Sequence, residues 1–157
     1  MIRKGVLAAV AAVWVMSATA GVAVAASEPK ELVTALYAEP SVTLAAGRAG
    51  GYFARDLDSA LRAGSSSPSQ VGAVDFDYRY GAQDLQVRGL QLIQEVDNDQ
   101  ARVVAVFKNF GRANSVDWTL CRRANGEWRI ADVSSNTGPQ DWDLRQLLNL
   151  PADRIRC

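Results

Sequence analysis

The chain has 157 residues, and its 17 Lys and Arg residues balance 17 Asp and Glu residues, so the formal charge at pH 7 is zero. This balance excludes a strongly basic nucleic-acid-binding protein, because contacts with phosphate need an excess of Lys and Arg. The sequence has no histidine, which excludes triads with a His base and metal sites that need imidazole.

The first 25 residues have the pattern of an export signal. Residues 3 and 4 are basic, and an uncharged apolar run covers residues 6–16. The small residues that follow fit cleavage after Ala20, Ala25 or Ala26. We therefore predict a signal peptide over residues 1–25 and one mature domain over residues 26–157, periplasmic or secreted. The alternative is an uncleaved anchor, since the uncharged run is long enough to span a bilayer.

Two amphipathic helices are predicted at the start of the mature domain. Ser27 is the expected N-cap of the first helix, which has apolar residues at helical spacing over 32–37 and ends at Pro40. The second helix has its apolar stripe over 53–61 and is expected to end at Gly64.

From residue 85 the apolar spacing alternates, which predicts consecutive antiparallel strands. The predicted strands cover residues 85–96 (as one or two strands), 101–110, 116–123 and 127–134. Both faces of the segment 101–110 are apolar, so this strand is expected inside the sheet rather than at its edge. Turns are expected at 97–99 and 111–115, and Asn125-Gly126 is typical of a hairpin turn.

The last segment predicts one more helix. Residues 136–139 interrupt the sheet, and Asp141 is expected to cap a helix whose Leu stripe covers 144–150 and which stops at Pro151. Helices and strands are thus segregated along the chain, which predicts an α+β fold. We expect a curved antiparallel sheet with the N-terminal helices and the C-terminal helix packed on it, leaving a cleft between sheet and helices.

Cys121 and Cys157 are the two cysteines of the chain. In an exported protein they are candidates for a disulfide, which would close a loop of roughly 35 residues and stabilise the fold by about 3–4 kcal/mol. Two unpaired thiols are the alternative. Two cysteines so far apart do not form a metal site, and we predict neither a metal nor a cofactor.

Several short segments occur in an order that resembles a family of small exported bacterial proteins of unknown function. These segments are Asp75-Phe-Asp-Tyr78, Gly81-Ala-Gln-Asp84, the strand beginning at Ala101, Asn125–Asp132, and Trp142 before a Leu-rich helix. Members of that family resemble nuclear-transport-factor-2-like (cystatin-like cone) domains. The resemblance covers roughly residues 30–150 and implies a cone-shaped fold with a pocket, but no particular reaction.

The densest acidic cluster comprises Asp75, Asp77 and Asp84, with Tyr78 between them. One hypothesis places these residues in a site at the mouth of the cone. There, a carboxylate whose pKa is raised by burial acts as a general base beside a Tyr donor, and Asp132 is a further candidate base. The structural alternative is that these Asp side chains cap turns in an irregular loop. A calcium site needs six or more oxygen ligands, and no recognised calcium-loop spacing is present.

Large aromatic residues offer a second possible site. Phe107, Trp118, Trp128 and Trp142, together with Tyr78, either line a ligand cavity or form the core between helices and sheet. The basic residues of the strands, such as Arg102, are expected to pair with Asp117 or Glu127 on a solvated sheet face.

Our leading hypothesis is a non-catalytic exported domain that binds a small apolar molecule or an envelope protein through the cleft and the loop 75–84. The alternative is an isomerase- or hydratase-like enzyme with an Asp base and a Tyr donor. A homodimer formed through the open sheet face is a third option. We expect no nucleic-acid partner, and contact with the membrane only through the signal peptide.

Overall fold

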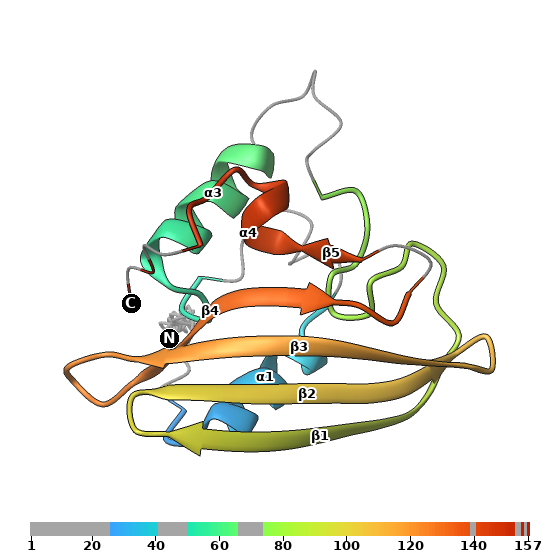
Figure 1. Ribbon diagram of the computed structural model, residues 1–157, viewed down its shortest axis with the longest axis horizontal. Helices are drawn as coiled ribbons and strands as arrows, with labels where there is room; N and C mark the ends of the chain where they lie inside the picture. The colour runs from blue at the N-terminus through green and yellow to red at the C-terminus, as the bar shows by residue number, and fades with distance from the viewer. Residues whose placement is uncertain (1–25, 41–49, 66–73, 139–140, 153–154, 156) are drawn as a thin grey trace, which may run out of the picture.

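The computed structural model describes residues 26–40, 50–65, 74–138, 141–152, 155 and 157. They form the predicted α+β fold, with helices packed on a five-stranded antiparallel sheet (Figure 1). The helices are α1 (Pro29–Ala38), α3 (Arg55–Ser65) and α4 (Leu144–Leu147). The strands are β1 (Val87–Asp97), β2 (Gln100–Asn109), β3 (Arg112–Arg122), β4 (Trp128–Ser135) and β5 (Trp142–Asp143).

The strands follow one another across the sheet in chain order, each antiparallel to its neighbour. The segment 85–96 yields one strand, β1, with a bulge between Arg88 and Gln91. The predicted turns at 97–99 and 125–126 are confirmed, with left-handed backbone at Asn98 (φ 53°) and Gly126 (φ 86°). Strand β2 pairs with β1 and β3 and therefore lies inside the sheet, as predicted.

The predicted turn over residues 111–115 is wrong in its extent. Phe110 (φ 49°) and Gly111 (φ 78°) both adopt left-handed backbone, so two residues suffice to reverse the chain. Strand β3 therefore already begins at Arg112, which pairs with Asn109.

Helix α1 lies where the sequence predicts it, but Ser27 is not its N-cap. Glu28 takes that position, and its side chain makes no capping hydrogen bond to the helix. The Ser27 hydroxyl donates to the Glu31 carboxylate, at 3.2 Å. The helix ends before Pro40, and Glu39 is extended, as expected for a residue that precedes proline. The buried face of α1 consists of Leu32, Val33 and Leu36.

Helix α3 begins later than its apolar stripe predicts, because Phe53 is not helical. The backbone there lies parallel to β4: the Ala54 N–H donates to the Ile130 carbonyl (2.7 Å), and the Ile130 N–H donates to the Tyr52 carbonyl (2.8 Å). Gly64 does not stop the helix, which continues to Ser65.

The C-terminal region differs most from the prediction. Residues Trp142 and Asp143 form a fifth strand, β5, that pairs with Ser135 and Ser134. Helix α4 is a single turn, and its N-cap is Asp143 rather than the exposed Asp141. The carboxylate of Asp143 accepts a hydrogen bond from the Gln146 N–H (2.9 Å). The N-cap lies two residues later than predicted, because Trp142 and Asp143 form β5 and the helix begins only at Leu144.

The two faces of the sheet differ in character, because side chains alternate along each strand. The inner face packs against α1 and carries the core residues Val103, Ala105, Phe107, Val116, Trp118, Leu120, Ile130 and Val133. We call the opposite side the outer face. It carries Ile93 of β1, Arg102, Val104 and Val106 of β2, Asp117 of β3 and Ser134 of β4.

A disulfide joins Cys121 of β3 to Cys157, with 6.0 Å between the two Cα atoms and a sequence separation of 36. The pairing that the sequence left open is thus formed, and the Arg123 Nε–H donates to the Cys157 carbonyl at 2.9 Å. Disulfides are typical of oxidising compartments, so the bond indicates an extracytoplasmic location. In the described ranges, no helix is long and apolar enough to cross a membrane. The predicted signal peptide, residues 1–25, lies outside the described residues.

Candidate functional site

Of the three clustered Asp residues, Asp77 belongs to a buried ion pair with Arg79. Its carboxylate accepts hydrogen bonds from the Arg79 Nη2 (2.6 Å), Nε (2.9 Å) and backbone N–H (3.0 Å). Arg79 then donates through Nη1 to the Glu39 carbonyl (2.6 Å) and the Tyr37 carbonyl (3.3 Å). The pair thus satisfies carbonyl groups at the C-terminal end of α1, and the geometry matches the structural interpretation of Asp77.

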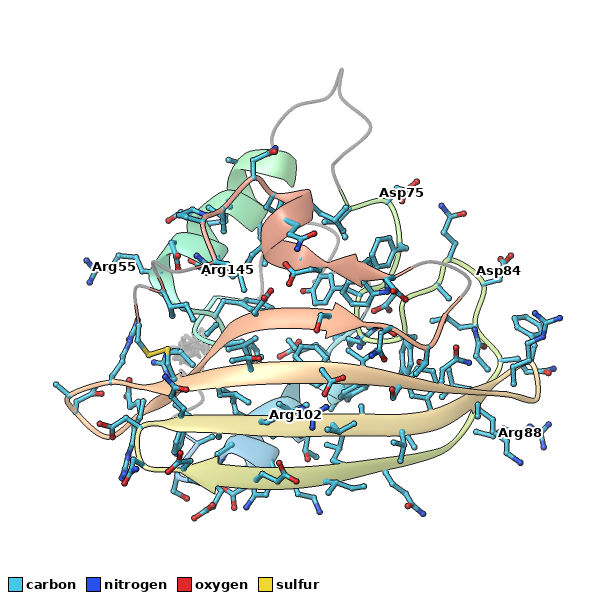
Figure 2. The ribbon with its side chains drawn as sticks, viewed as in Figure 1. Arg55, Asp75, Asp84, Arg88, Arg102 and Arg145 are labelled. Atoms are coloured by element: carbon cyan, nitrogen blue, oxygen red, sulfur yellow. A yellow bond between two sulfur atoms is a disulfide. The ribbon has the colours of Figure 1, made fainter. Side chains whose placement is uncertain are left out.

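Asp75 and Asp84 are exposed and lie at the outside of the molecule (Figure 2). Asp75 accepts a hydrogen bond from the Gln83 side chain (3.3 Å). The backbone carbonyl of Asp84 accepts one from Asn109 (3.1 Å). The carboxylates of the predicted cluster therefore have separate environments, one in the interior and two in solvent.

Three of the predicted aromatic residues belong to one chain of edge-to-face ring contacts. Tyr78 contacts Trp118 (6.4 Å between ring centroids), Trp118 contacts Tyr37 (5.6 Å), and Tyr80 links Tyr37 to Phe107 (5.4 Å in both contacts). Tyr78, Phe107 and Trp118 are all buried. Burial raises the pKa of the Tyr78 phenol above its usual value, so this phenol keeps its proton. Such contacts are characteristic of a packed core.

The other two predicted aromatic residues lie apart from this chain of rings. Trp128 is buried at the start of β4, with the Arg122 guanidinium 5.7 Å from its ring centroid. Trp142 is half-buried on β5 and contacts Phe76, with 5.1 Å between ring centroids. It also covers Gly81, which has a φ of 62° and whose added Cβ would lie 2.9 Å from the Trp142 Nε1. The structure therefore does not gather the five predicted aromatic residues around one space.

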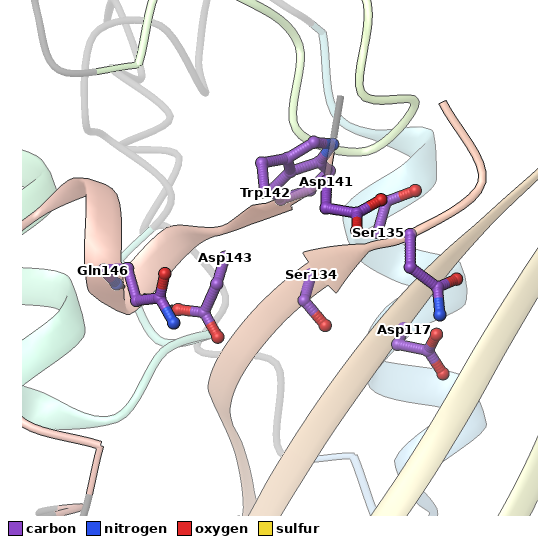
Figure 3. A pocket seen from close by; sticks show the side chains of 8 residues that line it. Asp117, Ser134, Ser135, Asp141, Trp142, Asp143 and Gln146 are labelled. Carbon is purple, nitrogen blue, oxygen red and sulfur yellow. Dashed lines mark hydrogen bonds between the residues drawn. The ribbon is translucent and has the colours of Figure 1, made fainter. Parts of the chain in front are cut away.

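A polar recess lies where β3, β4 and β5 run side by side next to α4 (Figure 3). We call it the outer pocket; its volume is about 240 Å³. The antiparallel pairing places Asp117, Ser134 and Asp143 in one row across the three strands. The complete lining consists of Asp117, Ser134, Ser135, Asn136, Asp141, Trp142, Asp143 and Gln146.

The charge of the outer pocket is negative. Its described lining contains three aspartates and no Lys or Arg. The predicted pairing of Arg102 with Asp117 is confirmed, and it neutralises one of the three carboxylates. Asp141 is exposed, and Asp143 caps α4. Within the described ranges, no group of three or more His, Cys, Asp or Glu side chains is arranged to hold a metal ion.

Asp132 lies beside this pocket and has an unusual protonation equilibrium. Burial, and then the charge of Asp143, raise its pKa from 3.8 to about 6, and the two carboxyl groups share a hydrogen bond. The Asp132 carboxylate also accepts the backbone N–H groups of Val133 (2.8 Å) and Arg145 (3.2 Å). Because Asp132 pairs with the exposed Thr119, it lies on the outer face, whereas Tyr78 packs against Trp118 on the inner face.

The sequence pointed to Trp142, which lines the outer pocket, and to Asp132, which lies beside it, but it did not identify the other lining residues as a site. Asp117 carries a signal in the sequence, because it alternates with Val116 and Trp118 and so marks the polar side of β3. Asp141 and Asp143 carry no such signal, because the strand β5 that positions them is only two residues long.

No family model, curated protein or solved structure matches the chain. The resemblance to nuclear-transport-factor-2-like domains therefore stays a prediction.

Proposed function

We propose that this protein is an exported, non-catalytic binding domain. Its partner is an envelope protein that docks on the outer face of the sheet and places a cationic side chain in the outer pocket. The observation that carries the proposal is the exposed outer face, which lies in front of α1 in Figure 1 and ends in an acidic recess. We retain the cone-shaped, nuclear-transport-factor-2-like fold as part of this proposal, supported by the strand order and by the packing of α1 on the inner face.

The character of the outer face supports a protein partner. Ile93, Val104 and Asp117 form one cross-strand row that leads to the pocket. Ile93 is 53% exposed, and Val104 is partly exposed. A broad face with scattered apolar groups and a polar rim suits another protein surface, whereas small molecules prefer enclosed, mostly apolar cavities.

The packing of the inner face weakens the competing hypothesis of a small apolar ligand. The residues predicted to line an apolar cavity, such as Phe107 and Trp118, are buried against other aromatic rings. A ligand among them would have to replace these contacts. The outer pocket already offers a recess, and its carboxylates attract a Lys or Arg side chain.

The proposal is tested by NMR titration of the ¹⁵N-labelled protein. The cationic probe is N-acetyl-lysine methylamide, and the neutral control is N-acetyl-glutamine methylamide at the same ionic strength. Because isolated ion pairs at a surface are weak, we expect a dissociation constant on the order of millimolar for this fragment. Saturable shifts are expected for Ser134, Asn136 and Gln146 with the lysine probe alone.

Two charge-reversal variants separate the outer pocket from the acidic loop. Asp141→Lys changes an exposed residue of the pocket, and Asp84→Lys makes the same change in the loop. We expect Asp141→Lys to abolish the shifts and Asp84→Lys to leave them unchanged. Shifts centred on residues 75–84, or equal shifts with both probes, would refute the proposed site.

A second candidate function rests on Asp132. A carboxyl group whose pKa is near 6 is suited to act as a general base near neutral pH, and it lies beside the outer pocket. This supports an isomerase- or hydratase-like activity, in which Asp132 removes a proton from a carbon next to a carbonyl group. Tyr78, the Tyr donor that we predicted, does not suit this role, since its ring lies on the face of the sheet opposite to Asp132.

This activity is tested by incubating the protein in D₂O with a panel of small ketones and enones. Deuterium incorporation next to the carbonyl group is followed by ¹H NMR. If Asp132 is a base, the wild-type protein accelerates exchange with an apparent pKa near 6, and Asp132→Asn removes the acceleration. Equal exchange rates for both proteins exclude Asp132 as a base for these substrates.

A further inference from the structure

The two edges of the sheet are built differently. At one edge, β5 is only two residues long and is followed directly by α4. At the other edge, β1 is eleven residues long and pairs with β2 on one side, while its other side pairs with no described strand. A long free edge exposes backbone N–H and C=O groups that can pair with another strand.

The side chains of β1 are also mostly exposed to solvent. Apart from Val87 and Leu92, all of its residues are exposed. Three of them are large and apolar: Leu90 is 37% exposed, Ile93 53% and Val96 50%. Edge strands of monomeric proteins are usually short or protected by lysine, proline, other charges or a bulge. Strand β1 contains no lysine or proline, and its charged residues and its bulge lie towards its two ends.

Hydrogen bonds join helix α1 to β1 on the inner face of the sheet. The Lys30 N–H donates to the Gln94 side-chain carbonyl (3.0 Å), and the Gln94 amide donates to Glu28 (3.4 Å). These bonds join the first turn of α1 to the middle of β1. The edge is therefore ordered before any partner arrives, which lowers the entropic cost of pairing.

The sequence of β1 is complementary to itself when two copies run antiparallel. With a two-fold axis at Ile93, the two Ile93 side chains face each other. Gly89 and Leu90 form the bulge and together occupy one position along the strand. Val96, three positions after Ile93, therefore lies opposite Leu90 of the second copy. Asp97 lies opposite Arg88 of the second copy. The three exposed apolar residues thus meet one another, and each end of the strand forms a pair of opposite charges. Between them, Leu92 lies opposite Gln94, and Gln91 lies opposite Glu95 of the second copy.

We propose that two copies of this protein associate through β1, forming one continuous ten-stranded antiparallel sheet centred on Ile93. The occupant of the free edge is a second copy of the chain, because in this register the three exposed apolar residues of β1 meet one another and opposite charges meet at both ends. The proposal does not rest on the proposed function, since the outer pocket lies at the opposite end of the sheet.

The oligomeric state is measured by analytical ultracentrifugation of the exported protein with its disulfide intact. Ile93→Lys places two like charges at the two-fold axis and should weaken dimerisation by at least about tenfold. The matched control is Phe110→Lys, which replaces another exposed apolar residue (57%) at the β2–β3 turn. This control should remain dimeric.

A charge exchange tests the register itself. Arg88→Asp alone and Asp97→Arg alone should each weaken the dimer, because each places like charges opposite each other. The double variant Arg88→Asp/Asp97→Arg restores opposite charges at both ends and should recover the dimer. Recovery of the dimer by the double variant would show that the two residues face each other across the antiparallel pairing. If each residue acted independently, the double variant would weaken the dimer by the sum of the two single effects.

Hydrogen exchange of the wild-type protein provides a readout that does not depend on the folding of any variant. Backbone amides of β1 should become more protected as the protein concentration rises, while those of β3 should not change. A wild-type protein that stays monomeric at millimolar concentration overturns the proposal. So does a dimer that Ile93→Lys leaves intact. Both results leave the probe titration of the outer pocket unaffected, so the two proposals fail separately.

Discussion

At the residue scale, the buried ion pair between Asp77 and Arg79 is the clearest case of a candidate site residue with a structural task. Their side chains are 11% and 4% exposed, and the guanidinium group also binds carbonyl groups at the end of α1. Asp77 cannot serve as a free base without breaking this arrangement. The loop 74–84 is thereby attached to the first helix.

We predict that Arg79→Met lowers the free energy of unfolding by about 3–5 kcal/mol, because it leaves the Asp77 carboxylate buried without its partner. The control is Arg62→Met, which breaks the pair with Asp58 on the surface of α3 and should cost about 0.5 kcal/mol. Denaturant unfolding measures both values. Adding Asp77→Asn to Arg79→Met should recover part of the loss, and equal costs for the two Arg variants would contradict the structural role.

The raised pKa of Asp132 predicts a specific pH dependence of the free energy of unfolding. Its pKa is raised from 3.8 to about 6 on folding, so between these values the folded state keeps a proton that the unfolded state has lost. The contribution of Asp132 to stability is therefore greatest below pH 4 and declines as the pH rises through 6. After allowance for partial exposure, the loss amounts to about 1–2 kcal/mol.

The matched variant is Asp132→Asn, which keeps an oxygen acceptor but cannot ionise. Relative to the wild type, it should gain about 1–2 kcal/mol of unfolding free energy between pH 4 and pH 7. Asp143→Asn, which retains an N-cap residue, should lower the pKa of Asp132. Both are followed by urea unfolding at several pH values and by ¹³C NMR of the Asp132 carboxyl group. A constant difference between wild type and Asp132→Asn would contradict the raised pKa.

At the element scale, the sequence predicted those features that depend on local periodicity and turn chemistry. Strand β2 followed from its two apolar faces, and the hairpin at Asn125-Gly126 followed from the backbone preference of glycine. Features that depend on tertiary contacts were not predictable. Strand β5 exists only because two residues meet β4, and Phe53 leaves the helical pattern because its backbone lies against Ile130. The outer pocket could not be predicted for the same reason, since its lining is brought together by the pairing of β5 with β4.

The disulfide connects β3 with the C-terminal segment and should be a major stabilising element. Its removal in the double variant Cys121→Ser/Cys157→Ser should lower the free energy of unfolding by about 3–4 kcal/mol, as expected for a loop with a sequence separation of 36. Unfolding of the wild type in guanidinium chloride, with and without a reducing agent, provides the comparison. A change below about 1 kcal/mol on reduction would argue that the bond contributes little.

At the scale of the whole molecule, the sheet divides the protein into a packed side and an open side. The inner face carries α1 and the chain of aromatic rings, whereas the outer face leads to an acidic recess. This asymmetry supports binding at the outer face rather than in the interior. The outer pocket lies at the β5 side of the sheet, away from the β1 edge at which a second copy is proposed to pair.

The most direct test of docking at the outer face is site-specific photo-crosslinking in the native cell envelope. A benzophenone amino acid is placed at Val104 on the outer face and, as controls, at Ser59 on the exposed side of α3 and at Asp84 in the loop. We predict one adduct with a second protein from position 104 alone, which disappears when Asp141→Lys is added. An adduct formed from position 59 or 84 but not from 104 would contradict the account.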